Sequence, residues 1–150
     1  MFDVRPFSVE LSSPLVTADG TISRRKGFLI VIDHAGTRGV GEATPLPGWT
    51  ESYEECREAL GRASEVAEEL DWGIALAKTD RPAARHGLAL ALAESRARRD
   101  GGPLYRYLGD DRFVPSVPVN ATIGDGSATE TARQAREAVV EGFDCLKLKA

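Results

Sequence analysis

The sequence lacks the features that mark several specialised classes of protein. It has only two cysteines, Cys56 and Cys145, and 7% aromatic residues. Two isolated cysteines make neither a disulfide framework nor a metal site, so both are interpreted as buried thiols in a reducing cytoplasm. The longest uncharged apolar run, 87–93, is too short to cross a bilayer, so no membrane partner is expected.

A strong excess of one charge is also lacking. The formal net charge is -4 over 150 residues, which gives no electrostatic case for binding nucleic acid or an acidic membrane surface. The basic run Arg24–Lys26 is interpreted as a solvated turn. The N-terminal residues Met1–Arg5 do not form a targeting signal, so the cytoplasm is the expected location.

The first third of the sequence predicts a three-stranded antiparallel meander. Three stretches contain β-compatible residues and are separated by turn signals such as Asp19-Gly20: 2–11, 28–32 and 40–43. Gly36, Gly39 and Gly41 do not have the spacing of a dinucleotide-binding fingerprint, so they are interpreted as turn glycines between two strands.

Helices are predicted after this sheet. Ser52 and Glu55 have capping-box spacing and precede an amphipathic stripe that continues to Leu70. A second helix is expected to begin near Pro82 and to end at Arg99, before a pair of glycines. Residues 103–109 predict one further short helical turn.

The pattern then changes to strand, helix and strand. Residues 117–123 predict a strand, Ser127 and Glu130 form a second capping-box pattern, and residues 145–149 predict another strand. A βαβ unit of this length implies parallel pairing and a right-handed crossover. The chain is therefore predicted to be α+β first and to continue with the opening of an α/β domain.

Lys147 and Lys149 are the candidate chemical groups of the last strand. Side chains alternate along a strand, so the two lysines share one face and the neighbouring leucines share the other. A like-charged neighbour and partial desolvation lower the pKa of a lysine, which allows it to act as a general base. The alternative is a solvated edge strand protected by two lysines.

Trp49 follows the stretch 45–48 and is predicted to be either a substrate wall or a packing contact with the next helix. The loop 124–126 is interpreted as an ordinary connection between strand and helix, in preference to an anion site. His34 and His86 have no spaced partners and are not assigned as ligands.

Several segments together resemble one family, in the same order and over nearly the whole chain. The stretch Gly39–Ser52 resembles the GxGExxPLPG segment of o-succinylbenzoate synthases and their muconate-lactonizing relatives in the enolase superfamily. Three further segments resemble the mobile loop with the second strand, the helix before the barrel, and the first barrel strand of these enzymes: 19–29, 82–88 and 117–123. Lys147-Leu148-Lys149 resembles the KxK motif that ends the second barrel strand.

The resemblance implies an α+β capping domain at residues 1–112, followed at 113–150 by the first βαβ of a (β/α)8 TIM-type barrel. It implies a carbon-oxygen lyase for menaquinone biosynthesis, with a small-molecule carboxylate as substrate, Lys149 as base and Lys147 as the neighbour that lowers its pKa. The substrate contacts implied by the capping-domain loops are Asp19, Thr21, Ser23, Pro47, Gly48 and Trp49.

The family's Mg²⁺ ligands lie on later barrel strands, so no metal ligand is assigned within residues 1–150. Two strands do not close a barrel, so these residues are expected to be inactive and prone to aggregate alone. The resemblance is also compatible with a homo-oligomer.

Other functions stay open at this point. An N-acylamino acid racemase, a dipeptide epimerase or a muconate cycloisomerase would share the same scaffold and KxK motif. A non-catalytic α+β module that binds a partner through the Trp49 loop is the alternative from another class. Ordinary high pKa values for Lys147 and Lys149 would favour that module.

Overall fold

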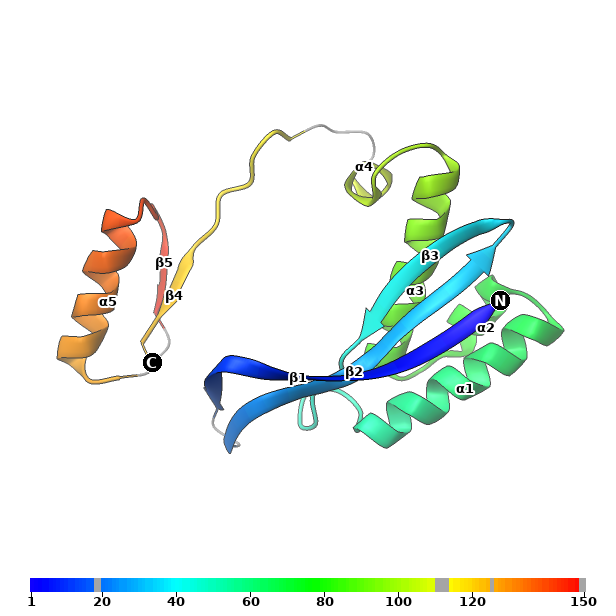
Figure 1. Cartoon of the computed structure of the whole chain (residues 1–150), viewed down its shortest axis with the longest axis horizontal. Coiled ribbons are helices and arrows are strands. Elements are labelled where there is room, and N and C mark those ends of the chain that lie inside the picture. The colour runs from blue at the N-terminus through cyan, green and yellow to red at the C-terminus, as the bar shows by residue number, and fades with distance from the viewer. Residues whose placement is uncertain (18–19, 110–113, 125, 149–150) are drawn as a thin grey trace. The chain divides into compact units, whose positions relative to one another are not determined.

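The computed structural model describes residues 1–17, 20–109, 114–124 and 126–148. The chain divides into two compact units, Met1–Phe113 and Val114–Ala150. In chain order (Figure 1) the elements of the described residues are β1 (Phe2–Thr17), β2 (Gly20–His34), β3 (Thr37–Ala43), α1 (Tyr53–Glu69), α2 (Trp72–Lys78), α3 (Pro82–Arg99), α4 (Leu104–Leu108), β4 (Ala121–Ile123), α5 (Ala128–Val140) and β5 (Leu146–Leu148).

The first unit contains the expected antiparallel meander, with strand order β1-β2-β3. The hairpin of β1 and β2 is longer than predicted, because pairing continues beyond an irregularity between Glu10 and Leu15. Residues 12–16 are exposed, so the hydrophobic pattern did not reveal this extension. The distal end of the hairpin is therefore held mainly by its own strand pairing.

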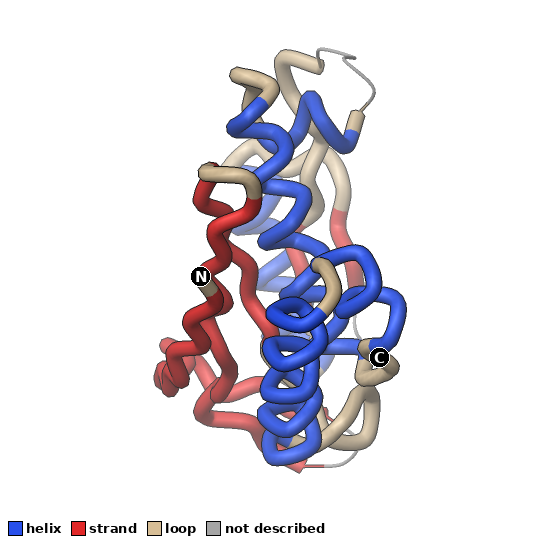
Figure 2. The backbone as a smooth tube through the Cα atoms, turned by 90° about the vertical axis from the view of Figure 1, so that its right-hand side faces the viewer, coloured by secondary structure: helices blue, strands red, loops and turns tan. Residues whose placement is uncertain are grey.

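The core of the first unit lies between one face of this sheet and the helices. Phe28, Ile30 and Ile32 alternate along β2 and are almost completely buried. Leu60 of α1 and Leu88 of α3 belong to the same core cluster. Helices α1, α2 and α3 lie on that face of the sheet (Figure 2). Burial of each large side chain contributes about 1.5–3 kcal/mol.

Two glycines of β3 allow α3 to pack directly on the sheet. A β-carbon on Gly39 would lie 2.0 Å from the carbonyl oxygen of Ala91, and one on Gly41 would lie 2.0 Å from that of Gly87. The interpretation of Gly39 and Gly41 as turn glycines was therefore wrong. They lie within β3 and lack side chains because the helix backbone occupies that space.

The predicted helix ends are largely confirmed. Ser52 and Glu55 form a complete capping box at the start of α1, and α3 spans Pro82–Arg99 as expected. Helix α2 was not predicted because its seven residues are too few to show a helical period. Its one local signal is Asp71, whose carboxylate accepts a hydrogen bond from Ile74 N at 2.9 Å.

The second unit contains the expected βαβ arrangement, with β4 and β5 paired in parallel. β4 is shorter than the predicted strand 117–123, and residues 117–120 are exposed. Ser127 accepts from Glu130 N, but the Glu130 carboxylate pairs with Arg133. Cys145 is exposed, so only Cys56 is the buried thiol that was expected.

Within the described ranges, no helix is both long and apolar enough to cross a membrane.

Candidate functional site

The loop between β3 and α1 is held in a tight turn. The carbonyl oxygen of Leu46 accepts hydrogen bonds from Trp49 N at 2.9 Å and from Thr50 N at 2.8 Å. Thr50 Oγ1 accepts from Leu46 N at 2.8 Å, which closes the turn from the other side. Gly48 has φ of 91°, a conformation that L side chains rarely adopt. The turn therefore presents Pro47 and Trp49 on a fixed backbone.

Glu51 anchors the end of this loop to α3. Its side chain is buried, and its two oxygens accept from Ala83 N at 3.0 Å and from Ala84 N at 2.8 Å. A carboxylate is favoured there because the first amides of a helix lack partners within the helix. These two hydrogen bonds of Glu51 tie the loop that carries Trp49 to the core. Glu51 also lies near Cys56. Burial, with Glu51 as a secondary cause, raises the pKa of the Cys56 thiol to about 12.

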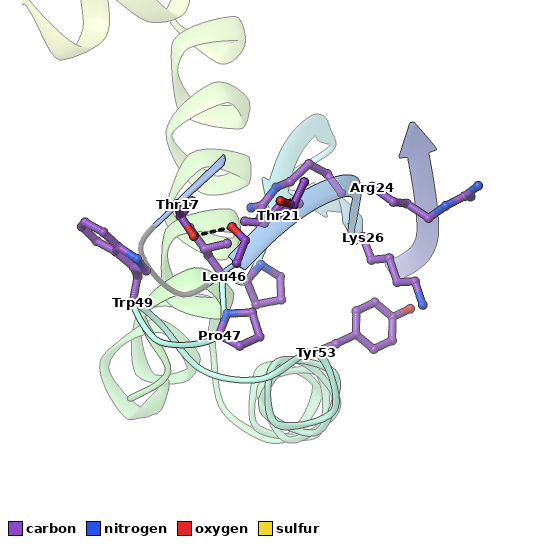
Figure 3. Close-up of a pocket in the computed structure, with 12 residues that line it drawn as sticks. Thr17, Thr21, Arg24, Lys26, Leu46, Pro47, Trp49 and Tyr53 are labelled. Atoms are coloured by element: carbon purple, nitrogen blue, oxygen red, sulfur yellow. Dashed lines mark hydrogen bonds between the residues drawn. The ribbon is translucent and has the colours of Figure 1, made fainter. Parts of the chain in front are cut away.

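The distal end of the β1–β2 hairpin and this loop line one pocket of about 370 Å³ (Figure 3). Three residues that were expected to contact the substrate line it: Thr21, Pro47 and Trp49. Ser23 and Gly48 are not among the described residues that line it, and Asp19 lies outside the described residues. Trp49 is 77% exposed, so it is a pocket wall rather than a packing contact with the helix.

The pocket also contains a basic group that sequence reasoning missed. Arg24, Arg25 and Lys26 all line the pocket, although their run was interpreted as a solvated turn. The sequence did contain a signal for these positions. Arg24 and Lys26 alternate along a strand with Phe28, which is buried, so all three lie on the same face. This signal could have placed them on the helix-facing side of the sheet.

The side chain of Tyr53 defines one end of the pocket. Its ring stacks on Phe28, with centroids 4.5 Å apart. In Figure 3 Tyr53 and Lys26 lie at the same end, and Trp49 lies at the opposite end. Leu46 and Pro47 lie between them, so the pocket has an apolar wall between a basic end and an aromatic end.

Lys147 lies in β5 of the second unit. It pairs with Thr122 of β4, and both residues are exposed. Ala121, Ile123 and Leu146, which alternate with them, are half-buried. Asn120 lies on the same side as Thr122 and donates a hydrogen bond to Thr122 Oγ1 at 3.3 Å. The uncovered face of the two strands is therefore polar, while Lys149 lies outside the described residues.

The described residues do not supply an evident metal site. No group of three or more histidine, cysteine, aspartate or glutamate side chains that could hold a metal ion occurs in the part of the chain that the structure describes. The described residues therefore do not fit a Mg²⁺ site of their own.

The fold and these segments match known proteins. The model of the family described as MenC, N-terminal domain, matches residues 2–95, and the chain belongs to this family. The solved structures with a similar fold include a protein of the mandelate racemase and muconate lactonizing group at 22% identity, with a TM-score of 0.81. At that identity the likeness shows the fold alone. The expected fold class is confirmed: an α+β capping domain followed by the first βαβ unit of an incomplete barrel.

Three relatives define the similarity more closely. The L-Lys-D/L-Arg epimerase of Methylococcus capsulatus is 33% identical over 97% of this chain and 44% of its own length. A dipeptide epimerase from the same organism, crystallised with Mg and the dipeptide L-Arg-D-Lys, is 30% identical, has a TM-score of 0.74, and is covered over 45% of its chain.

An o-succinylbenzoate synthase of Thermosynechococcus elongatus, crystallised with Mg, has a TM-score of 0.67 at 23% identity, over 99% of this chain and 42% of its own. At that identity it shows the fold alone. The chain spans less than half the length of these relatives.

Proposed function

We propose that the protein belongs to an enzyme that removes the proton α to a carboxylate, and that its reaction is the epimerisation of dipeptides. The observation that carries this proposal is the 33% identity to an L-Lys-D/L-Arg epimerase over 97% of the chain. Epimerisation was an alternative to the lyase reaction in the sequence-based prediction. It is preferred here because that curated relative and several of the similar structures are epimerases.

In this proposal the second unit carries the base. Lys149 removes the α-proton, and Lys147 lowers the pKa of Lys149 by repulsion between the two ammonium groups. Residues two apart on a strand lie about 6.6 Å apart along it, which is close enough for this effect in a pocket of low dielectric constant. The polar face formed by Asn120, Thr122 and Lys147 supports this assignment, because it would face the interior of a closed barrel.

Residues 1–112, which lie within the first unit, act as the cap in this proposal, and the barrel begins at residue 113. Its pocket brings the hairpin end and the Trp49 loop together, as expected for two loops that enclose one substrate. The proposed substrate contacts are Asp19, Thr21, Ser23, Pro47, Gly48 and Trp49. Enclosure of the substrate would exclude water and strengthen the electrostatic interactions around it.

The second candidate is the lyase reaction that yields o-succinylbenzoate. It is favoured by the match to the MenC N-terminal domain and by the PLPG stretch at 45–48. Both reactions begin with the same proton abstraction. In the lyase the enolate expels a β-hydroxyl group, whereas in the epimerase a proton returns to the opposite face of the α-carbon.

Mg²⁺ is proposed as the cofactor because several similar structures were crystallised with it. It would stabilise the negative charge that develops on the substrate carboxylate.

The test uses the protein purified at the full length that its own gene encodes. The protein is assayed with Mg²⁺ for two reactions. Inversion of dipeptides is followed by chiral chromatography, and dehydration of a cyclohexadiene carboxylate to o-succinylbenzoate, the expected lyase reaction, is followed by absorbance. We expect inversion to have the larger kcat/KM. Faster dehydration would replace the proposal with the lyase, and the absence of both reactions would favour the non-catalytic module.

A further inference from the structure

We propose that Glu51 is a positioning residue, which holds Trp49 in place as a wall of the pocket through its two hydrogen bonds to α3. This inference rests on the proposed function, in which the loop that carries Trp49 encloses the substrate. It concerns how that loop is held, and neither the identity of the substrate nor the proton abstraction itself.

Trp49 is not held in place by its own side chain. The side chain is 77% exposed, so it has few neighbours that could fix it. Gly48, directly before it, has φ of 91°, which glycine adopts readily. The position of Trp49 therefore depends on how the backbone on either side of it is fixed.

The three residues after Trp49 attach the chain to three different places. Thr50 Oγ1 accepts from Leu46 N at 2.8 Å, within the turn itself. Ser52 Oγ accepts from an amide in the first turn of α1 at 3.3 Å. Glu51 instead bonds to α3, beginning 32 residues later in the chain. Of the three, Glu51 is thus the residue that fixes the loop to an element distant in sequence.

Helix α3 in turn depends on Glu51 for its cap. The N-cap residue of α3 is Arg81, which makes no hydrogen bond with its side chain to the helix end. Pro82 follows and has no N–H group, so the amides of Ala83 and Ala84 are the first that need partners. Both donate to Glu51, at 3.0 and 2.8 Å. The loop therefore supplies the cap that the local sequence lacks, and the helix fixes the loop.

Helix α3 is a firm support for this loop. Its backbone packs directly on β3 at Gly39 and Gly41, where an added β-carbon would lie 2.0 Å from helix carbonyl oxygens. The Glu51 side chain is 6% exposed, so water competes little for its hydrogen bonds. A loop that is already fixed in its bound position does not have to be ordered when a substrate binds. Glu51 should therefore contribute to substrate binding and not to the chemical step.

The experiment compares substitutions of Glu51 with a substitution that strains α3 elsewhere. Glu51→Gln keeps the shape of the side chain but replaces one acceptor oxygen with an NH₂ group, which cannot accept from an amide. Glu51→Asp keeps both acceptor oxygens on a shorter side chain. Gly41→Ala is the matched control, because it disturbs the same helix at its contact with β3.

Two quantities are measured on the full-length protein and each variant. Steady-state kinetics of inversion with Mg²⁺ give kcat and KM separately, for the dipeptide with the largest kcat/KM in the unaltered protein. Amide hydrogen exchange, followed by mass spectrometry on peptides that contain residues 46–52, reports how firmly the loop is held. The Trp49 and Thr50 amides are informative, because both donate to Leu46 O within the turn.

We expect Glu51→Gln to raise KM about tenfold and to change kcat by less than about twofold. A loop that is correctly placed only a tenth of the time weakens apparent binding by that factor. Exchange in the loop should become faster by about the same factor. Glu51→Asp should recover part of both losses. Gly41→Ala should leave KM and the loop exchange unchanged, even where it speeds exchange within α3.

A double substitution tests whether Glu51 acts through Trp49. In the Trp49→Ala background, Glu51→Gln should raise KM no further, because the wall that it positions is already gone. An equal further rise in that background would overturn the inference. So would an unchanged KM in Glu51→Gln, or the same rise in Gly41→Ala, which would indicate a merely structural role.

The exchange measurement separates this inference from the proposed reaction. If no dipeptide is inverted, the proposed function fails, and the loop exchange then decides the inference alone. Faster exchange of the loop in Glu51→Gln but not in Gly41→Ala would support it. Equal exchange in the two variants would refute it.

Discussion

The two units of the chain differ in how they bury their apolar side chains. In the first unit Phe28, Ile30 and Leu60 are almost completely buried between sheet and helices. In the second unit Ala138 is the buried residue among those that the structure describes, while Val140 is 88% exposed. The same difference applies to Leu148, which is 61% exposed.

This contrast shows that the two units differ in how far their own packing contacts determine their structure. The first unit is specified by its own packing, down to the glycines that admit α3 against β3. The second unit has regular elements and a helix cap, but it leaves large apolar side chains at its surface. We therefore expect substitutions to have large effects in the first unit and small effects in the second.

The largest expected difference between the two units is the loss of stability when an apolar side chain is shortened to alanine. Leu60→Ala should destabilise the first unit by about 2–5 kcal/mol because it empties a fully buried site. Val140→Ala should change the stability of the second unit by less than about 0.5 kcal/mol. Amide hydrogen exchange, measured by mass spectrometry on peptides from each unit, gives both values. Similar losses at the two sites would contradict the contrast.

The close contact between α3 and β3 should give the next largest effect. Gly41→Ala forces a methyl group against the helix backbone and should destabilise the first unit by about 1–3 kcal/mol. Gly61→Ala is the matched control because nothing lies within 4 Å of its added carbon, and it should stabilise α1 by about 0.5–1 kcal/mol. Urea unfolding measures both. A neutral Gly41→Ala would show that the helix can move away freely.

The two helix caps allow a smaller comparison. Ser52→Ala should cost about 1 kcal/mol because it removes one half of a complete capping box. Ser127→Ala should cost less, because Glu130 pairs with Arg133 and its carboxylate does not complete the cap. The exchange rates of the amides in the first turn of each helix report the two losses. A larger loss at Ser127 would contradict this account of the caps.

The smallest effect near neutral pH concerns the Cys56 thiol. Its pKa is raised in the folded protein to about 12 from an ordinary value of 9.0. The neutral thiol therefore contributes fully to stability below pH 9.0, and this contribution is lost as the pH rises towards 12. The stability difference between the unaltered protein and Cys56→Ala should be constant up to pH 9 and fall above it. A difference that does not change with pH would contradict the raised pKa.

The sequence predicted the elements whose signals are local. The meander, the capping box at Ser52, the bounds of α3 and the parallel βαβ unit follow from spacing, caps and β-branched runs. Helix α2 was too short to show a period. The extended hairpin depends on pairing between exposed residues, and the roles of Gly39 and Gly41 depend on a contact with α3, which is distant in sequence.

The candidate site was predictable in part for the same reason. The PLPG stretch and the hairpin loop were recognised by resemblance, and the structure brings Thr21, Pro47 and Trp49 to one pocket. The basic lining was missed because a run of charges in sequence does not show which side chains have internal partners. Only the structure shows that Glu10 neutralises Arg24 while Lys26 has no such partner among the described residues.

The central claim, that Lys149 removes a proton α to a carboxylate, is tested most directly by deuterium exchange. The protein isolated as its own gene encodes it is incubated with Mg²⁺ and L-Ala-L-Glu in D₂O, and deuterium at the α-carbon is followed by mass spectrometry. We predict inversion with incorporation of deuterium, and a loss of inversion by about 10²–10⁴-fold in Lys149→Met but not in Lys78→Met. Undiminished inversion in Lys149→Met would contradict the claim.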